Sequence, residues 1–145
     1  MKGADLYERD FAEWAAHNAK LIRLRRFAEA DLEHIAEEIE DMGKRDRREV
    51  SHRLKVLIAH LLKWTAQPER RGTATWSDTI EEQRSELDEI FEQSPSLRRY
   101  AEEDLQRIYP KAVRLAHKET GLEPHRFPGT CPYTIDRLLD IDYWP

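Results

Sequence analysis

Apolar residues recur every three or four positions along most of the chain, which is the spacing of amphipathic helices. The first such segment begins with a capping box, Asp5 followed by Glu8, and is expected to run as one helix to about Arg25. Its apolar face carries Tyr7, Phe11, Trp14, Leu21 and Ile22. Phe27 is expected to tuck under the following turn, and Asp31 is expected to cap the next helix.

A second apolar stripe follows Asp31 and continues as far as Trp64. Its members are Leu32, Ile35, Ala36, Ile39, Met42, Val50, Leu54, Leu57, Ile58, Leu61 and Trp64. Gly43 lies within it and allows either one long kinked helix or two shorter helices. The apolar phase continues through Gly43 at a spacing of about 3.5 residues, which favours the long helix. Around residues 56–62 apolar residues surround most of the helix, which is typical of a central, buried helix.

Proline and serine mark the helix boundaries in the second half of the chain. Pro68 is expected to end the central helix, and Ser77 is expected to cap the next one. Ser94, with a proline directly after it, predicts a further helix start. Pro110 falls inside the apolar stripe of that helix and is expected to kink or split it.

The chain closes with Gly121 as a helix end, an irregular Pro-rich segment over 123–132, and a short last helix from Thr134. No segment has a convincing strand pattern, and there is no internal repeat or linker. The length of 145 residues suits one domain. The sequence therefore predicts an all-α fold over residues 1–145, a single-domain bundle of about five to six helices with a long, kinked or straight, central helix.

The composition agrees with helices whose outer faces are solvated. Charged residues make up 37% and hydrophobic residues 39% of the chain, and there are five glycines. Cys131 is the single cysteine, which excludes an intrachain disulfide and agrees with a reducing cytosol. There is no apolar signal core at the start and no run near the roughly 20 residues that span a bilayer. We therefore expect a soluble cytoplasmic protein without membrane contact.

The net charge of −5 is unevenly distributed. Residues 28–42 contain seven acids and no Lys or Arg, and residues 43–71 contain nine Lys and Arg against three acids. In residues 77–106 the sign reverses, with ten acids against three arginines. Charge matching between helices of one bundle is the preferred explanation. The alternative is a basic face for an anionic partner, for which Arg45, Arg47, Arg48 and Arg53 are candidates weakened by the interleaved acids.

A series of motifs runs in order along nearly the whole chain. They are DLYERDFAEW, DLEHIAEEIEDMG, LIAHLLKW, QPERR, WSDTIEEQR, SPSLRRY, KETGLEP, FPGTCPYTIDRLLD and DYWP. With these motifs the chain resembles the Domain of Unknown Function twenty-nine family of bacterial proteins. Pro110 departs from the unbroken helix expected there. The resemblance implies an all-helical fold and no established activity, so it assigns no catalytic residue.

Several polar residues fall on helix faces that should point inward, among them Asn18, His60, Arg84 and Asp104. A buried polar group without a partner costs about 1–3 kcal/mol, so these side chains should meet one another, water or a ligand. Glu38 and Asp104 are the expected partners of Arg84. One interpretation is a network that fixes helix register. The other is a catalytic cleft in which His60 is an acid, base or ligand, Arg84 grips an anion, and Glu38 completes the set.

The loop between Trp64 and Trp76 is the second candidate site. Arg70 and Arg71 lie shortly before the helix start at Ser77, where free N–H groups could bind an anion. The indole faces could stack on bases or pair with cations. The alternative is that both tryptophans are core residues that hold the loop in place.

Four acids, Glu37, Glu38, Glu40 and Asp41, follow His34 and suggest a divalent-cation site. His34, Glu37 and Asp41 point away from the apolar stripe, and a second inward Glu-x-x-His pair is missing. A solvated face is therefore preferred, and we predict no metal and no cofactor.

Three functional hypotheses remain open. The first is a non-enzymatic helical interaction module that binds a protein partner or itself, which fits the dense charge patterning. The second is anion or nucleic-acid binding through the Arg70/Arg71 loop, which is not favoured. The third is a hydrolase-like enzyme built around Glu38, His60 and Arg84. The sequence does not decide whether the protein is an enzyme.

Overall fold

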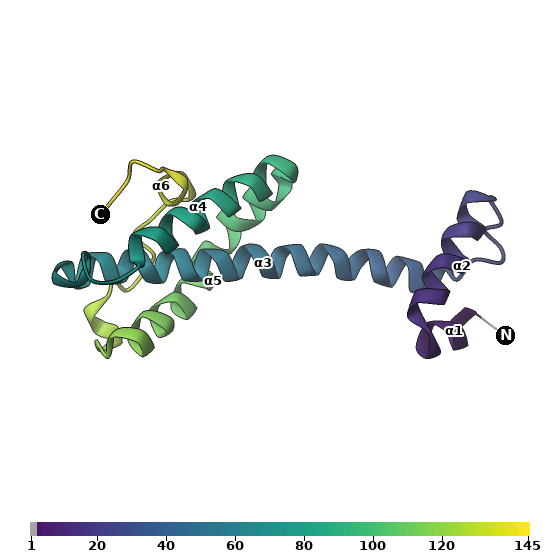
Figure 1. The fold of residues 1–145 in the computed structure, drawn as a ribbon, viewed down its shortest axis with the longest axis horizontal. Coiled ribbons are helices and arrows are strands. Elements are labelled where there is room, and N and C mark those ends of the chain that lie inside the picture. The colour runs from purple at the N-terminus through teal and green to yellow at the C-terminus, as the bar shows by residue number, and fades with distance from the viewer. Residues whose placement is uncertain (1–2) are drawn as a thin grey trace. The chain divides into compact units, whose positions relative to one another are not determined.

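The computed structural model describes residues 3–145, with side chains from Leu6 onward, and is helical throughout with no strand in this range. Its α-helices are α1 (Gly3–Arg9), α2 (Phe11–Arg23), α3 (Leu32–Ala66), α4 (Trp76–Gln93), α5 (Pro95–Thr120) and α6 (Ile135–Leu139). Two 3₁₀ helices, η1 (Pro68–Arg70) and η2 (Pro124–Arg126), complete the secondary structure. The predictions of an all-α fold and a long central helix, α3, are confirmed (Figure 1).

The chain divides into two compact units, unit 1 (Met1–Arg45) and unit 2 (Asp46–Pro145). Helix α3 begins in unit 1 and continues into unit 2. The single domain over residues 1–145 stays a prediction. Within residues 3–145, no helix carries an apolar run long enough to cross a bilayer.

The first predicted helix is in fact two helices. Asp10, between α1 and α2, has an extended backbone (φ −149°, ψ 89°), and its Oδ1 accepts the N–H of Glu13 at 3.1 Å. An N-cap residue has a non-helical backbone, so Asp10 ends one helix as it begins the next. The prediction of one helix to Arg25 is therefore wrong, and the proposed capping box at Asp5 lies outside the described side chains.

Helix α3 passes through Gly43 without a break, as the continuous apolar phase favoured. In unit 1, however, its apolar stripe is only partly covered: Ile35 is half-buried, but Leu32, Ile39 and Met42 are 53%, 60% and 52% exposed. The aromatic residues of the first two helices pack against the neighbouring face that carries His34. The reason is chemical, because aromatic residues such as Tyr7 have polar tips that need hydrogen-bond partners when they pack.

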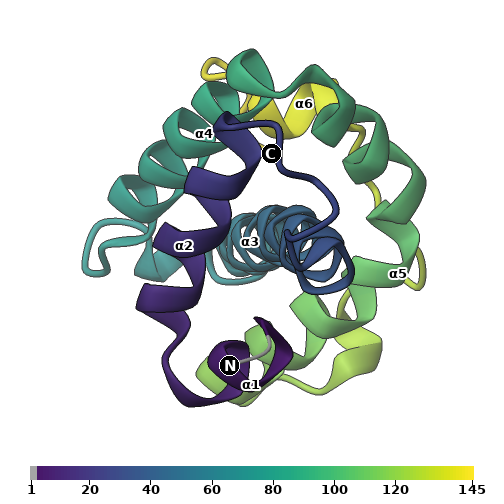
Figure 2. The ribbon, with the colours of Figure 1, turned by 90° about the vertical axis from the view of Figure 1, so that its right-hand side faces the viewer.

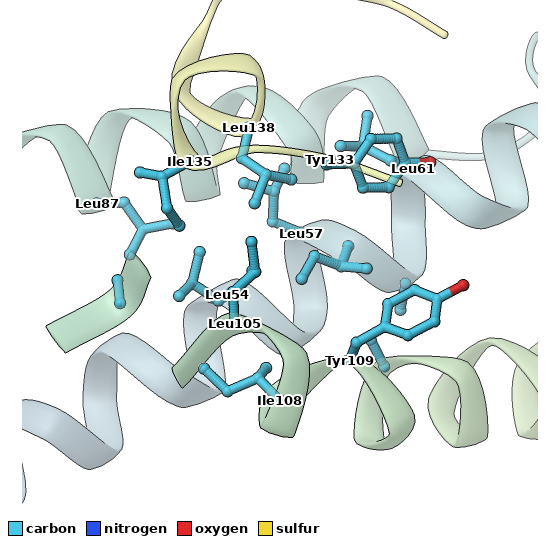
Figure 3. Packing of buried hydrophobic residues seen from close by; sticks show 14 of the residues in the cluster. Leu54, Leu57, Leu61, Leu87, Leu105, Ile108, Tyr109, Tyr133, Ile135 and Leu138 are labelled. Carbon is cyan, nitrogen blue, oxygen red and sulfur yellow. The ribbon is translucent and has the colours of Figure 1, made fainter. Parts of the chain in front are cut away.

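Unit 2 is built around the C-terminal part of α3, with α4, α5 and α6 arranged around it (Figure 2). Consecutive turns of α3 from Val50 to Leu62 are buried because apolar residues occupy most of its circumference there. Figure 3 shows how the α3 leucines meet side chains of the other helices. These are Leu87 of α4, Leu105 and Ile108 of α5, and Ile135 and Leu138 of α6.

Most helix boundaries of unit 2 follow the sequence signals. Ser94 is the N-cap position of α5, and Thr134 caps α6 by accepting the N–H of Arg137. Gly121 ends α5 with a left-handed backbone (φ 76°), which glycine adopts without steric cost. Pro110 lies inside α5 without splitting it, because the helix is continuous on both sides.

Ser77 is not the cap of α4, contrary to prediction. The helix begins one residue earlier, at Trp76, and its N-cap position is Thr75. Ser77 therefore lies within the first turn. Trp76 is buried there. A serine cap contributes about 1 kcal/mol, which is small beside the burial of a tryptophan, so packing can override the capping preference.

Candidate functional site

Unit 1 is held together by hydrogen bonds around Asn18, which is 2% exposed. Its side-chain amide donates to the backbone carbonyl of Trp14 at 3.0 Å, and its Oδ1 accepts the N–H of Asp31 at 2.7 Å. The inward position predicted for Asn18 is confirmed. Its two partners lie on α2 and at the start of α3, so Asn18 ties the turn between these helices to α2.

Asp31 and His34 form the charged part of this arrangement. Asp31 caps α3, as predicted, and its carboxylate receives the indole N–H of Trp14 at 3.0 Å and a bond from His34 Nδ1 at 2.7 Å. Burial acts to raise the pKa of Asp31, but the hydrogen bonds from His34 and Trp14 hold it below its usual value. The same bond to Asp31 raises the pKa of His34. His34 is therefore half-buried and hydrogen-bonded, and does not lie on the solvated face that the sequence favoured for it.

Tyr7 completes the packing of unit 1 from α1. Its ring stacks on that of His34 with centroids 4.0 Å apart, and its hydroxyl donates to Glu38 Oε1 at 2.5 Å. The hydrogen bond to Glu38 raises the pKa of Tyr7 to about 12. Glu38 also lies 3.9 Å from Arg45 Nη2. Glu38 is therefore paired with Tyr7 and Arg45, which both belong to unit 1.

An apolar groove of about 370 Å³ lies between α2 and α3 within unit 1. Four exposed hydrophobic residues line it: Phe11, Ile22, Ile39 and Met42. Leu24, Phe27 and Leu32, at the turn between these helices and the start of α3, are also about half exposed. Phe27 therefore does not tuck under the turn. We call these seven residues the apolar face.

Arg84 of α4 is 1% exposed, so its predicted inward position is confirmed. Its partners are not the predicted carboxylates. Nε donates to the carbonyl oxygen of Leu138 and Nη2 to that of Tyr143, both at 2.7 Å, and the guanidinium lies 5.3 Å from the ring centroid of Trp144. Nη1 is buried without a hydrogen-bond partner in the described part of the chain. Burial lowers the pKa of Arg84.

A second buried cation, Lys63, lies near the end of α3. It is 2% exposed, forms an ion pair with Glu119 of α5, and lies 5.4 Å from the ring centroid of Trp76. Its Nζ is 3.4 Å from Nε2 of His60, whose Nδ1–H donates to the carbonyl oxygen of Val56 at 2.8 Å. Burial, followed by the charge of Lys63, lowers the pKa of His60. The neutral imidazole thus has Nδ1 protonated and its Nε2 lone pair facing the ammonium.

The Arg70/Arg71 loop is ordered by its own tryptophans. Arg70 lies over the ring of Trp76 at 5.2 Å, and Arg71 lies over that of Trp64 at 4.8 Å. Arg71 Nε also donates to the carbonyl oxygen of Trp64 at 2.7 Å. These contacts engage both guanidinium groups and fit the alternative in which the tryptophans hold the loop.

Comparison with known proteins places the chain in one family. A model of the family described as "Domain of unknown function DUF29" matches residues 6–144, essentially the whole chain. The protein is a member of the DUF29 family. The chain matches no curated protein and no solved structure.

The DUF29 chain gives each of the three catalytic candidates its own set of partners. Glu38 binds Tyr7 in unit 1, and in unit 2 His60 binds Val56 and Lys63. Arg84 binds backbone carbonyls of the C-terminal segment. The catalytic role of these three residues stays a prediction.

Two residues of this DUF29 protein were missed by the sequence reasoning, Lys63 and Glu119. Lys63 follows a run of apolar residues in a helix that is buried nearly all round, and this was the available signal. A lysine in such a place needs a counter-charge. Its partner is 56 residues away, and no spacing rule connects residues at that distance.

Proposed function

We propose that this protein is a non-enzymatic helical interaction module, and that the apolar face of unit 1 binds a second copy of the chain. The observation that carries the proposal is the exposure of seven large hydrophobic side chains within 45 residues. Four of them line one groove, and exposed apolar side chains grouped in this way usually mark an interaction site. The proposal also places the protein in the bacterial cytoplasm, as expected from the sequence.

The area of the apolar face fits a small dimer. Its side chains are between 39% and 60% exposed, which corresponds to on the order of 600 Å² per copy if a large side chain offers about 150–250 Å². Two copies would bury about 1,200 Å², the lower end of specific protein interfaces. A helix pair from each copy would then form a four-helix arrangement, in which short helical hairpins commonly bury their apolar faces.

Charge favours a second copy over a partner of one sign. The two charged residues that line the groove, Glu38 and Arg45, lie 3.9 Å apart and have opposite signs. The groove therefore carries no excess of either charge. A two-fold axis would place the same neutral, apolar surface of each copy against that of the other.

The test compares one substitution at two exposed isoleucines. Ile39→Glu places a charge on the apolar face, and Ile141→Glu makes the same change at the 74% exposed Ile141 of unit 2. Sedimentation velocity of the wild type from micromolar to about millimolar concentration should give a monomer–dimer equilibrium. Ile39→Glu should remain monomeric with unchanged helix content by circular dichroism, and Ile141→Glu should dimerise like the wild type.

A wild-type chain that stays monomeric over this range would contradict the second copy as occupant. If a different purified protein then protected the apolar face, the interaction module would stand with another partner. If Ile39→Glu dimerised as well as the wild type, the apolar face would not be the interface.

The two other hypotheses have less support from the geometry. Anion binding through the Arg70/Arg71 loop would have to displace guanidinium groups that already stack on tryptophan rings. A hydrolase would have to use Arg84, which is 1% exposed and bound to backbone carbonyls.

A further inference from the structure

Basic side chains from α3 and α5 gather along one groove of unit 2, separate from the apolar face. The groove has a volume of about 280 Å³. Arg48, His52 and Lys55 line it from α3, and Arg107 and Lys111 line it from α5. Residues 48, 52 and 55 recur at helical spacing, so they share one side of α3.

The groove contains one acid, Asp104, whose charge is already matched. Arg107 binds it through two nitrogens, with Nε 2.8 Å from Oδ1 and Nη2 3.0 Å from Oδ2. The hydroxyl of Tyr100 donates to Asp104 Oδ2 at 3.1 Å. This leaves Arg48, Lys55 and Lys111 as the excess charge, and none of them has an ion pair among the described residues.

The other arginines of the basic segment are engaged elsewhere. Arg53 pairs with Glu49 at 3.1 Å and Glu86 at 3.7 Å, and Arg45 lies near Glu38 in unit 1. Arg47 lies over the ring of Tyr100, 5.3 Å from its centroid. Neither of the acids interleaved in this segment, Asp46 and Glu49, lines the groove, and Glu49 is matched by Arg53.

A hydroxyl group supplies a neutral donor in the same place. Ser51 Oγ of α3 and Tyr100 OH of α5 are 3.3 Å apart, and both residues line the groove. Because Tyr100 gives its proton to Asp104, Ser51 is the hydroxyl that can donate to a ligand. Three unmatched cations and one hydroxyl donor suit a ligand with several anionic oxygens, because charge-assisted hydrogen bonds to phosphate are strong and the cations repel one another without it. The volume lies near the lower limit of small-molecule sites, which favours a compact ligand.

We propose that the groove between α3 and α5 binds a small anion carrying two or more phosphate groups, held by Arg48, Lys55 and Lys111 with Ser51 as a hydroxyl donor. This site is independent of the self-association proposed for unit 1. The apolar face and the groove share no residue.

The test is calorimetric titration of the full chain with inorganic pyrophosphate at fixed ionic strength. The wild type should bind one pyrophosphate per chain. Lys55→Gln combined with Lys111→Gln should weaken binding at least about tenfold, since each cation contributes a charge-assisted contact. Lys118→Gln, at an exposed lysine of α5 outside the groove, should leave the affinity within about twofold. Lys55→Arg is the conservative variant within the groove; it keeps the charge and should retain binding.

A substitution that should strengthen binding distinguishes loss of the binding contacts from general unfolding of the chain. Asp104→Asn removes the acid of the groove and frees Arg107, so pyrophosphate should bind several-fold more tightly. No binding heat at millimolar pyrophosphate would overturn the proposal. Equal weakening in Lys118→Gln and in the groove variant would also overturn it, because the effect would then be overall charge. A single-stranded oligonucleotide that binds more tightly than pyrophosphate through the same lysines would replace the small anion with nucleic acid.

Discussion

Unit 1 and unit 2 are built from helices of the same amphipathic kind but bury them differently. Among the described side chains, two buried hydrophobic residues, Trp14 and Leu21, lie in unit 1, and twenty-two lie in unit 2. Seven of the eight large exposed hydrophobics lie in unit 1. Unit 2 is stabilised by a large apolar core, whereas unit 1 is held mainly by hydrogen bonds and stacked rings. An apolar stripe therefore predicts that one face of a helix is buried, but it does not predict which other element buries it.

The largest expected effect separates the two units directly. Leu57→Ala, at a position with 0% exposure in unit 2, should lower the free energy of unfolding by about 3 kcal/mol, because the lost methyl groups leave a cavity. Ile39→Ala in unit 1 should change it by less than about 0.5 kcal/mol when the chain is monomeric. Urea unfolding at low protein concentration, followed by circular dichroism, measures both. Equal losses would mean that Ile39 is buried in the monomer.

Arg84→Met tests whether the buried arginine of unit 2 is a structural tie. The carbonyls of Leu138 and Tyr143 would lose their donor, which should cost about 2 kcal/mol of unfolding free energy. The amides of α6 should exchange faster as the C-terminal segment loosens. Arg99→Met, an exposed arginine of α5, is the control and should have little effect. If Arg84→Met left the free energy of unfolding unchanged, the buried Arg84 would have no structural role in unit 2.

Asn18→Ala is the corresponding test for unit 1. The substitution removes the bonds to the Trp14 carbonyl and the Asp31 N–H, and should cost about 1–2 kcal/mol. The loss should appear as faster amide exchange in α2 and at the start of α3. The amides of α4 and α5 serve as the internal reference. Uniform loss of protection over both units would show that they unfold as one body.

The smallest effect is a difference in pH response between two histidines. The pKa of His34 is raised above 6.5 by Asp31, so its contribution to stability is complete below 6.5 and is lost as the pH rises through the folded value. The pKa of His60 is lowered by burial, so its neutral form is favoured and stability falls as the pH drops below 6.5. NMR titration should place the midpoint of His34 above that of His60. The reverse order would contradict both environments.

Most of the helices could be predicted from the sequence, but the contacts between them could not. The break at Asp10 was missed because Tyr7, Phe11 and Trp14 keep helical spacing across it. The available signal was a second capping pair, Asp10 with Glu13, and the structure uses that cap.

The candidate sites were harder to predict because their partners are remote or are backbone atoms. The inward positions of Asn18 and Arg84 followed from helix phase, and both side chains are buried. The partners of Arg84 are carbonyl oxygens, which every residue carries, so no residue pattern marks them. The groove between α3 and α5 depends on how two helices pack, because Lys55 and Lys111 are far apart in the chain.

Amide hydrogen exchange at two protein concentrations tests most directly whether the apolar face of unit 1 is covered by a second copy. Protection of α2 and of the α3 amides near Ile39 should increase as the chain is concentrated from micromolar to about millimolar, while α4 and α5 stay unchanged. Protection in unit 1 that does not depend on concentration would contradict self-association through this face.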